Sequence, residues 1–469
     1  MFFRRTLLVS VFCSLVGAPV VWAGTFQVDS TTDSPSINPG DGKCVSKAGG
    51  CTLRSAVQEA NASTLASTIQ VPPGTYTLSI APEGANFARS GGLMLDGEIT
   101  ISGDDFTRTI VDGGGVDRVF DVSRGSTVQI SGLTVQNGAA KGSDGGGLRN
   151  RGNLTMHDMF FSKNQATGDP GVANGRGGAI YNEARMNLMN VTIDSNQADG
   201  RGGGVYNGTS GQAQIMNGRI SSNRSLTDNG GGVLNAGNLS MSLLPIRRNH
   251  ASNGGGIDNV EGELKLFDVL LGDNVAGSNG GGLRNSGNAS LKNVTVGANQ
   301  AGVSGGGIDN RAKGQVNLNN VTVAQNQAGT ESQGQGGGVH GDAQGSVSFA
   351  NTLIAANTVG GQPSDCAGVL TSKGYNLVSS RAGCTLTGEA TGNLLDKPAG
   401  LEALASNGGP APSFALSESS LAVDAGNPAS PSGTWSTCLG ADQRGVRRPQ
   451  AGKPGAKPRC DIGAYERKL

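Results

Sequence analysis

Aromatic residues are scarce in this 469-residue chain: Phe, Trp and Tyr together account for 4% of it, whereas 79 residues are glycine. Such a composition lies outside the usual range of a globular domain. The glycines do not recur at every third position, which excludes a collagen triple helix. Hydrophobic residues make up 36% of the chain and alternate regularly with polar ones, which argues against intrinsic disorder. Internal repetition explains the glycine content better.

An excess of one charge sign and a long apolar run are also missing. The chain has 36 basic and 36 acidic side chains, so nucleic acid is not expected as a partner. No segment approaches the length of an uninterrupted apolar membrane span, so no transmembrane segment is expected. No Cys lies near a His at the spacing of a metal site, and we expect neither a metal ion nor another cofactor.

Residues 1–23 have the features of an export signal. Arg4 and Arg5 precede an apolar stretch from Leu7 to Val16, and the small-residue ending VWA closes the segment. The apolar stretch is too short for a permanent transmembrane helix. The sequence therefore predicts an exported protein that is secreted or periplasmic, or associated with the outer surface.

The cysteines lie outside the repeats described below. Cys13 belongs to the export signal, and the other six form three pairs that are close in sequence: Cys44 and Cys51, Cys366 and Cys384, Cys438 and Cys460. Other connectivities and free buried thiols are alternatives. In an exported chain with an even number of cysteines, however, this clustering predicts disulfide bonds between neighbours.

Three consecutive glycines open the segment GGGLRNSGNASLKNVTVGANQ (residues 280–300), and the same pattern recurs between residues 145 and 357 at intervals of about 24 to 31 residues, a period typical of solenoids. Within a copy, apolar and polar residues alternate as in a strand: Leu291, Val294 and Val296 should face one way and Thr295 the other. The period leaves room for about three short strands. The repeats therefore predict an all-β parallel β-helix whose coils stack about 4.8 Å apart.

Glycine supplies the positive φ of sharp corners and lets neighbouring coils approach closely. Asparagine also recurs at fixed points of the coil, tolerates left-handed corners, and can hydrogen-bond to its own copy in the next coil. We expect ladders of stacked amides at two corners. One ladder comprises Asn150, Asn182, Asn207, Asn235, Asn259, Asn285 and Asn310, and the other comprises Asn164, Asn196, Asn223, Asn249, Asn274, Asn299, Asn326 and Asn357. Asn190, Asn293 and Asn320 also lie in Asn-x-Ser/Thr sequons, but we do not expect glycosylation.

Both ends of a solenoid need a cap. The segment CTLRSAVQEANAS places Leu53, Val57 and Ala60 on one helical face behind Thr52 as N-cap, which predicts a short capping helix. A Pro-, Gly- and Ser-rich segment follows the last repeat. We expect an N-terminal cap with the first coils over residues 24–98, repeats over 99–360, and a disulfide-containing C-terminal module over 361–469.

The terminal motifs resemble those of a family of exported bacterial right-handed parallel β-helix proteins. CTLRSAVQEAN is similar to the CSLREA-type N-terminal motif of that family, and SNGGPAPSFALSESSLAVDAGN with DQRGVRRP and CDIGAYE is similar to its choice-of-anchor Q domain. The repeats resemble the GGA[ILV] and FxxN tetrapeptides of chlamydial polymorphic outer-membrane proteins, with GGAI at residues 177–180 and FSKN at 161–164.

This resemblance implies a right-handed, pectate-lyase-like solenoid and export. It does not imply one activity, because the wider β-helix class includes pectate lyases, glycosidases, adhesins and passive stalks. In the resembling family a sorting or anchoring segment usually follows the C-terminal module, whereas this chain ends at CDIGAYERKL. We therefore expect release or periplasmic residence rather than surface anchoring.

The position before the first corner Asn carries the most varied chemistry of the repeat. In stacked coils it would form an outward column of Arg149, Tyr181, Tyr206, Leu234, Asp258, Arg284, Asp309 and His340. Tyrosines suit stacking on sugar rings, and the charged residues could bind or attack an acidic polysaccharide. We expect Tyr181, Tyr206, Asp258, Arg284, Asp309 and His340 to form a ligand-contact surface. The alternative is ordinary cross-strand pairing of solvated charges.

Two functions remain open at this point. The first is a monomeric, non-catalytic exported protein whose long rigid face contacts polysaccharide or a cell surface in an adhesin-like or binding role. The second is a polysaccharide lyase or glycoside hydrolase that acts on an extracellular polysaccharide. No catalytic residue is assigned, because no catalytic motif stands out.

Overall fold

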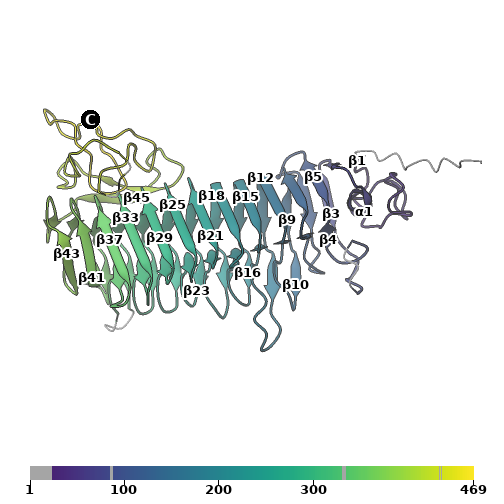
Figure 1. Ribbon diagram of the computed structural model, residues 1–469, viewed down its shortest axis with the longest axis horizontal. Helices are drawn as coiled ribbons and strands as arrows, with labels where there is room; N and C mark the ends of the chain where they lie inside the picture. Colours follow the sequence, from purple (N-terminus) through teal and green to yellow (C-terminus); the bar gives the residue numbers. More distant parts are fainter. Residues whose placement is uncertain (1–23, 85–87, 330–333, 433, 435) are drawn as a thin grey trace, which may run out of the picture.

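The computed structural model describes residues 24–469 except 85–87, 330–333, 433 and 435. The predicted export signal, with Cys13, lies outside the described residues. The described chain winds into an elongated stack of coils whose strands pair in parallel with their counterparts in the next coil (Figure 1). The predicted all-β parallel β-helix is therefore confirmed.

The coils contribute strands to four columns, in chain order, and the fourth column begins only at residue 139. The first column comprises β4 (Leu93–Leu95), β7 (Phe120–Val122), β11 (Leu148–Asn150), β14 (Ile180–Asn182), β17 (Val205–Asn207), β20 (Val233–Asn235), β24 (Ile257–Asn259), β28 (Leu283–Asn285), β32 (Ile308–Asn310), β36 (Val339–Gly341) and the N-terminal part of β41. The second column comprises β1 (Thr25–Gln27), β2 (Ser67–Val71), β5 (Glu98–Gly103), β8 (Thr127–Ser131), β12 (Asn153–Ser162), β15 (Arg185–Asp194), β18 (Gln212–Ser221), β21 (Asn238–Ser242), β25 (Glu263–Phe267), β29 (Asn288–Lys292), β33 (Gln315–Asn319), β37 (Ser346–Ala350), β41 (Cys366–Lys373) and β43 (Cys384–Glu389).

The third column comprises β3 (Gly74–Thr77), β6 (Thr109–Asp112), β9 (Thr134–Gln136), the C-terminal halves of β12, β15 and β18, β22 (Pro245–Arg247), β26 (Leu270–Gly272), β30 (Thr295–Gly297), β34 (Thr322–Ala324), β38 (Leu353–Ala355), β42 (Leu377–Val378) and β44 (Leu394–Leu395). The fourth comprises β10 (Ala139–Lys141), β13 (Gln165–Thr167), β16 (Gln197–Ala198), β19 (Arg224–Ser225), β23 (His250–Ala251), β27 (Val275–Ala276), β31 (Gln300–Ala301), β35 (Gln327–Ala328), β39 (Thr358–Val359) and β40 (Gln362–Pro363). The prediction of about three strands missed the fourth column, because strands this short show no alternation.

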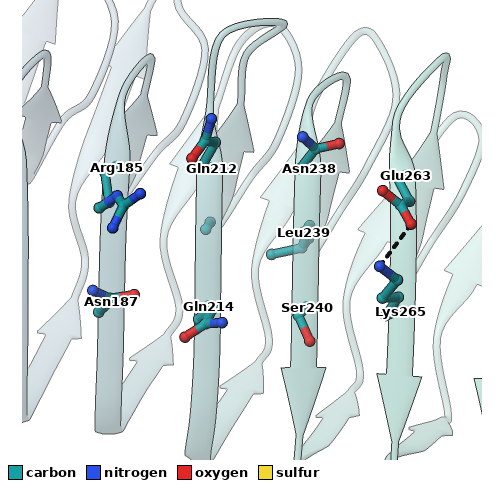
Figure 2. A pocket seen from close by; sticks show the side chains of 10 residues that line it. Arg185, Asn187, Gln212, Gln214, Asn238, Leu239, Ser240, Glu263 and Lys265 are labelled. Carbon is teal, nitrogen blue, oxygen red and sulfur yellow. Dashed lines mark ion pairs between the residues drawn. The ribbon is translucent and has the colours of Figure 1, made fainter.

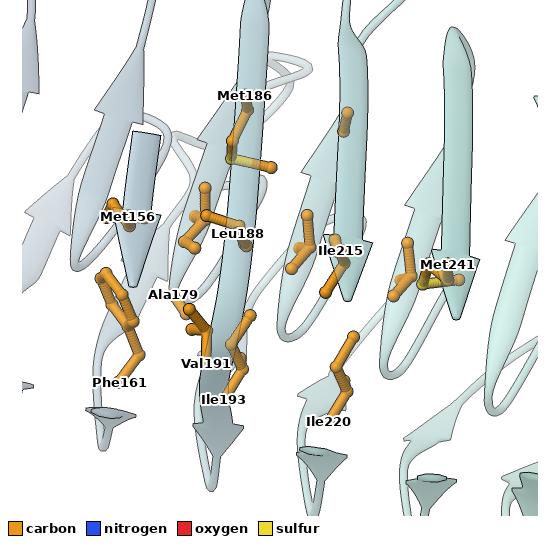
Figure 3. Packing of buried hydrophobic residues seen from close by; sticks show 14 of the residues in the cluster. Met156, Phe161, Ala179, Met186, Leu188, Val191, Ile193, Ile215, Ile220 and Met241 are labelled. Carbon is orange, nitrogen blue, oxygen red and sulfur yellow. The ribbon is translucent and has the colours of Figure 1, made fainter. Parts of the chain in front are cut away.

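The interior of the stack is apolar. Alternate residues of each strand, such as Leu188 and Ile215 on the second column and Ile193 and Ile220 on the third, point inward and pack on their neighbours one coil away (Figure 3). At about 25 cal/mol per Å² of apolar surface removed from water, this continuous core is the main stabilising contribution. The strand alternation read from the sequence therefore identified the core.

The corners differ in detail from the prediction. In the coil that contains β32, the left-handed residues are Gly305 (φ 62°), Ala312 (φ 48°), Asn320 (φ 52°) and Gln325 (φ 56°). The ladder residues Asn310 and Asn326 are not among them, so the expectation that both ladders occupy left-handed positions is wrong. At one of these corners the residue directly before the ladder Asn adopts this conformation instead.

The two asparagine columns form hydrogen-bonded ladders inside the stack. Asn259 Nδ2 donates to Asn285 Oδ1 (2.7 Å), and Asn285 Nδ2 donates to Asn310 Oδ1 (2.8 Å). In the other ladder, both the backbone N–H and the Nδ2 of Asn274 donate to Asn299 Oδ1, each at 3.0 Å. All of these side chains are fully buried. Each amide therefore satisfies polar groups that the core would otherwise leave unpaired.

The glycine triplets serve both a corner and a close approach. The first glycine of a triplet has a positive φ, as at Gly305. A Cβ on the second, Gly281, would lie 2.3 Å from the carbonyl oxygen of Gly306 in the next coil. Side chains at this corner would therefore force the coils apart.

The N-terminal end is covered by α1 (Leu53–Ala62), as predicted. The Thr52 side chain accepts a hydrogen bond from the Ser55 backbone N–H, and Leu53, Val57 and Ala60 are buried against the first coils. A disulfide joins Cys44 to Cys51 just before the helix.

The coils continue beyond residue 360. The N-terminal part of β41 pairs with β36 and extends the first column, and β41 to β44 extend the second and third columns. The Cys366–Cys384 disulfide joins β41 to β43 within the stack. The remaining chain, with the β45 (Leu401–Ala405) and β46 (Ser413–Leu416) hairpin, folds back over the end of the stack. We call residues 396–469 the folded-back module; it contains the Cys438–Cys460 disulfide.

The folded-back module covers part of the third column and the corner before it. Asn293 Nδ2 donates to the Ala441 carbonyl (2.9 Å), and the Leu439 N–H donates to Asn320 Oδ1 (2.9 Å). Asn293 and Asn320 are at most 1% exposed. Their sequons are therefore inaccessible to glycosylation in the folded protein, whereas Asn190 is exposed.

Candidate functional site

The residues predicted to form a contact surface do stack in register on the first column. Tyr181 pairs with Tyr206, Asp258 with Arg284, Arg284 with Asp309, and Asp309 with His340. Strand pairing sets their spacing at about 4.8 Å per coil. The structure thus brings together the residues that the sequence placed in one column.

Most of the column is buried, however, although Arg284 is partly exposed. Tyr181, Tyr206 and His340 are 4%, 7% and 9% exposed, and Asp258 and Asp309 are fully buried. The glycine corners lie directly over the column: a Cβ on Gly254 would meet that of Asp258 at 2.7 Å. The expectation of a solvated column is therefore wrong, because the sequence pattern gives side-chain direction but not the cover provided by the preceding turn.

The tyrosines use their polar and aromatic groups inside the protein. The rings of Tyr181 and Tyr206 stack with centroids 5.1 Å apart, and the Arg176 guanidinium lies 4.8 and 4.9 Å from the two centroids. Tyr181 Oη donates to Glu183 Oε1 (2.6 Å). Burial, and then the hydrogen bond to Glu183, raise the pKa of Tyr181 above its usual value. These rings stabilise the coil stack and offer no free face to a sugar.

The charged end of the column is also paired internally. Arg284 Nη1 lies 3.4 Å from Asp258 Oδ2. Burial raises the pKa of Asp258 to about 7, although Arg284 acts in the opposite direction. Asp309 accepts hydrogen bonds from Arg311 Nε (2.6 Å) and contacts His340 Nδ1 (2.7 Å). Near the C-terminal end of the column, His340 and Arg311 border an open hollow.

The second column presents a different outward surface, which we call the polar face. Its side chains form two rows running along the stack. One row contains Arg185, Gln212, Asn238, Glu263, Asn288 and Gln315, and the other contains Asn187, Gln214, Ser240, Lys265, Ser290 and Asn317. Uncharged hydrogen-bonding groups predominate, and Lys265 Nζ lies 2.7 Å from Glu263 Oε1.

Most of these polar groups have no partner in the protein. Within the described part of the chain, the side chains of Asn187, Gln214, Ser240, Ser290 and Asn317 make no hydrogen bond to another residue. They project from strands whose backbones are fully paired, so their positions are fixed by the sheet. The polar face therefore offers ordered donors and acceptors at the strand spacing.

The polar face is hollowed rather than flat. One hollow of about 320 Å³ lies over β15, β18, β21 and β25, where Asn187, Gln214 and Ser240 line it (Figure 2). A second, of about 490 Å³, continues over β25, β29 and β33 and shares Ser240, Glu263 and Lys265 with the first. Five strand spacings separate β15 from β33, so the two neighbouring hollows together extend over about 24 Å of the polar face.

A third row adds apolar surface beside these polar groups. Met189, Met216 and Phe267 occupy the next outward position and are 46%, 43% and 44% exposed. Apolar side chains can pack against the C–H faces of sugar rings while amides and hydroxyls bind their OH groups. The polar face combines both kinds of group.

Sequence reasoning did not select this face, although its signal was present. Segments such as QAQIM, NLSMS and NASLK place an amide or hydroxyl at alternate positions of every copy. The first column drew attention because its residues were chemically varied, whereas uniform uncharged rows resemble an ordinary solvated strand face.

Neither a metal centre nor a membrane helix is found in the part of the chain that the structure describes. No group of three or more His, Cys, Asp and Glu side chains there is arranged to hold a metal ion. No helix there is long and apolar enough to cross a membrane.

Comparisons with known proteins agree with a repeat architecture. Residues 158–183 match the model of the Chlamydia polymorphic membrane protein repeat. A crystal structure of pectate lyase Pel9A is similar over 96% of this chain and 98% of its own, at 15% identity and a TM-score of 0.49. The A-module of the Azotobacter vinelandii mannuronan C-5 epimerase AlgE4 is similar over 73% of this chain and 92% of its own, at 12% identity and a TM-score of 0.27. No curated protein matches the sequence. The fold assignment rests on the strand pairing described above.

Proposed function

We propose that this chain is an exported, non-catalytic β-helix protein that binds polysaccharide along the polar face. The observation that carries the proposal is the double row of regularly spaced amide and hydroxyl groups, most of them without partners among the described residues, which runs beside exposed Met189, Met216 and Phe267. An extended glycan offers hydroxyls and apolar ring faces in repetition, and a regular solenoid face can match such a repeat.

Export is supported by the signal-like residues 1–23 and by the three disulfides, since disulfides persist in oxidising compartments. The resemblance of the terminal segments to CSLREA and choice-of-anchor Q motifs supports the same inference. We propose a monomer that is secreted or periplasmic, and contact with a cell-surface glycan would give it an adhesin-like role.

The enzyme alternative has less support on this face. Glycoside hydrolysis usually employs two carboxylates that flank the scissile bond. Among the residues that line the two hollows, Glu263 is the carboxylate, and it is paired with Lys265. Binding therefore fits this chemistry better than hydrolysis does.

The test is retention of the purified protein on a panel of neutral and acidic polysaccharides, with soluble reducing ends measured in the same samples. Gln214→Ala combined with Phe267→Ala should weaken retention about tenfold or more. Gln300→Ala combined with Gln327→Ala is a matched control, because these exposed glutamines project from the fourth column. Unchanged retention in the first variant would remove the polar face, and new reducing ends would favour the enzyme alternative.

A further inference from the structure

An open hollow of about 550 Å³ lies near the C-terminal end of the first column, around the corner from the polar face. We call it the end hollow. The polar residues that line it are Ser304, Gln335, Arg311, Asp342 and His340. At this hollow the charged residues of the first column border solvent-accessible space.

His340 is held in a fixed orientation at this hollow. It is 9% exposed, and its Nδ1 lies 2.7 Å from Oδ1 of the fully buried Asp309. Because Asp309 is also paired with Arg311, we assign the proton of this contact to His340 Nδ1. The other ring nitrogen, Nε2, has no hydrogen-bond partner among the described residues, and the ring lines the hollow.

Arg311 is attached to the other oxygen of the same carboxylate. Its Nε donates to Asp309 Oδ2 (2.6 Å) and its Nη2 donates to Asn279 Oδ1 (2.6 Å). These bonds leave Nη1 without a protein partner in the described chain, and the side chain is 31% exposed. One buried carboxylate thus orients two nitrogen groups, His340 Nε2 and Arg311 Nη1, at the edge of one hollow.

We propose that the end hollow is a binding site for the carboxylate of an acidic sugar, and that it binds when His340 is protonated. Two adjacent charged N–H donors suit the two oxygens of a carboxylate. This site is separate from the polar face, whose unpaired groups are mostly uncharged, and it would add selectivity for acidic glycans to a surface that recognises hydroxyls.

The charges around the hollow explain the proton dependence. With His340 neutral, the carboxylates of Asp309 and Asp342 outnumber the Arg311 cation among these four residues, and Nε2 presents a lone pair, so binding of an anion is disfavoured. Asp342, which accepts a hydrogen bond from the Gln344 N–H (3.1 Å), is a second carboxylate among the residues that line the hollow. With His340 protonated, the charges balance and Nε2 becomes a donor.

The experiment follows the ring signals of the three histidines by NMR while trigalacturonate is added to the full chain at pH 5.5 and pH 8. At pH 5.5 the His340 signals should shift on binding, with an affinity about tenfold or more above that at pH 8. The trimethyl ester of the same sugar, which lacks the charges, should leave the His340 signals in place. His340 signals that do not move at pH 5.5, or that move equally with the ester, would overturn the proposal.

Variants give a second, independent readout. His340→Asn keeps a donor near Asp309 but deletes the outward nitrogen, and it should remove the acid-dependent part of trigalacturonate binding. His157→Asn is the matched control, because His157 Nδ1 also contacts an aspartate, Asp158 (2.9 Å), but on an exposed surface far along the stack. Equal loss in both variants, or loss in neither, would contradict a site at His340. Because the His340 signals report on this hollow alone, binding at the polar face leaves them unchanged and the two sites are tested separately.

Discussion

Replacing one ladder amide in the middle of the stack tests how the coils are held together. Asn285 is fully buried, donates Nδ2 to Asn310 Oδ1 (2.8 Å) and to the Gly287 carbonyl (2.9 Å), and accepts from Asn259 Nδ2 (2.7 Å). Asn285→Leu keeps a similar volume but removes these bonds. Asn310 Oδ1 then has no donor from the preceding coil, whereas Asn259 Nδ2 keeps its hydrogen bond to the Gly262 carbonyl (3.0 Å).

The expected loss of stability follows from this inventory. A net hydrogen bond contributes about 1 kcal/mol, and a buried acceptor left without a partner costs roughly 1 to 3 kcal/mol. Asn285→Leu should therefore lower the free energy of unfolding by about 2 to 4 kcal/mol. Asn288→Leu, three residues further on, is the matched control, because this asparagine is exposed and makes no side-chain hydrogen bond in the described chain. The control should change stability by about 0.5 kcal/mol or less.

The assay is urea denaturation followed by circular dichroism, combined with amide hydrogen exchange. A long solenoid can unfold in parts, so exchange at the N–H groups of β28 and β32 provides the local readout. If Asn285→Leu and Asn288→Leu unfold at the same urea concentration and exchange alike, the ladder does not stabilise the coil stack.

Three further outcomes are expected. Far-UV circular dichroism should show a strand-dominated spectrum, and a predominantly helical one would contradict the architecture. Burial raises the pKa of Asp258 to about 7. The contribution of Asp258 to stability is therefore fully present below about pH 4 and is lost as the pH rises towards 7. Asp258→Asn should flatten part of this decline in pH-dependent melts, and an unchanged slope would contradict the assigned burial effect. Replacing Cys438 and Cys460 with serine should loosen the folded-back module by about 3 kcal/mol, so that limited proteolysis cuts after residue 395, and resistance equal to the parent would argue against this role.

The repeated features of the fold were predictable because they depend on local rules. The alternation of apolar and polar residues predicted the core, and the recurrence of asparagine at the same point of each coil predicted the amide ladders. The N-cap at Thr52 and the helical face behind it were also visible, since capping depends on adjacent residues. The fourth column was not predictable, because its strands are too short for a period. The extension of the stack through β41 to β44 was missed because the glycine triplet and the ladder asparagine no longer mark these coils.

The candidate site was less predictable because exposure depends on contacts distant in sequence. Asp258 and Asp309 point away from the core, as the alternation indicates, yet the glycine corner before each strand covers them. Nothing in the local pattern distinguishes them from Gln214 or Asn317, which have the same outward direction on the second column and remain uncovered. The repeat pattern predicted the register of the charged residues on the first column. The glycine turns that precede these strands, which the pattern does not place, bury most of that column.

The same limit explains how the folded-back module defines the polar face. Thr295 and Thr322 on the third column are outward hydroxyls, but Thr295 Oγ1 donates to Gln443 Oε1 (2.5 Å) and Thr322 Oγ1 accepts from the Ala464 N–H (3.0 Å). Ser290 and Asn317, on the neighbouring second column of the same two coils, keep their polar groups for solvent or ligand. Because a buried hydroxyl or amide must find a partner, the module supplies one to each of these two threonines that it covers. The groups that remain unpaired therefore mark the surface available to a ligand.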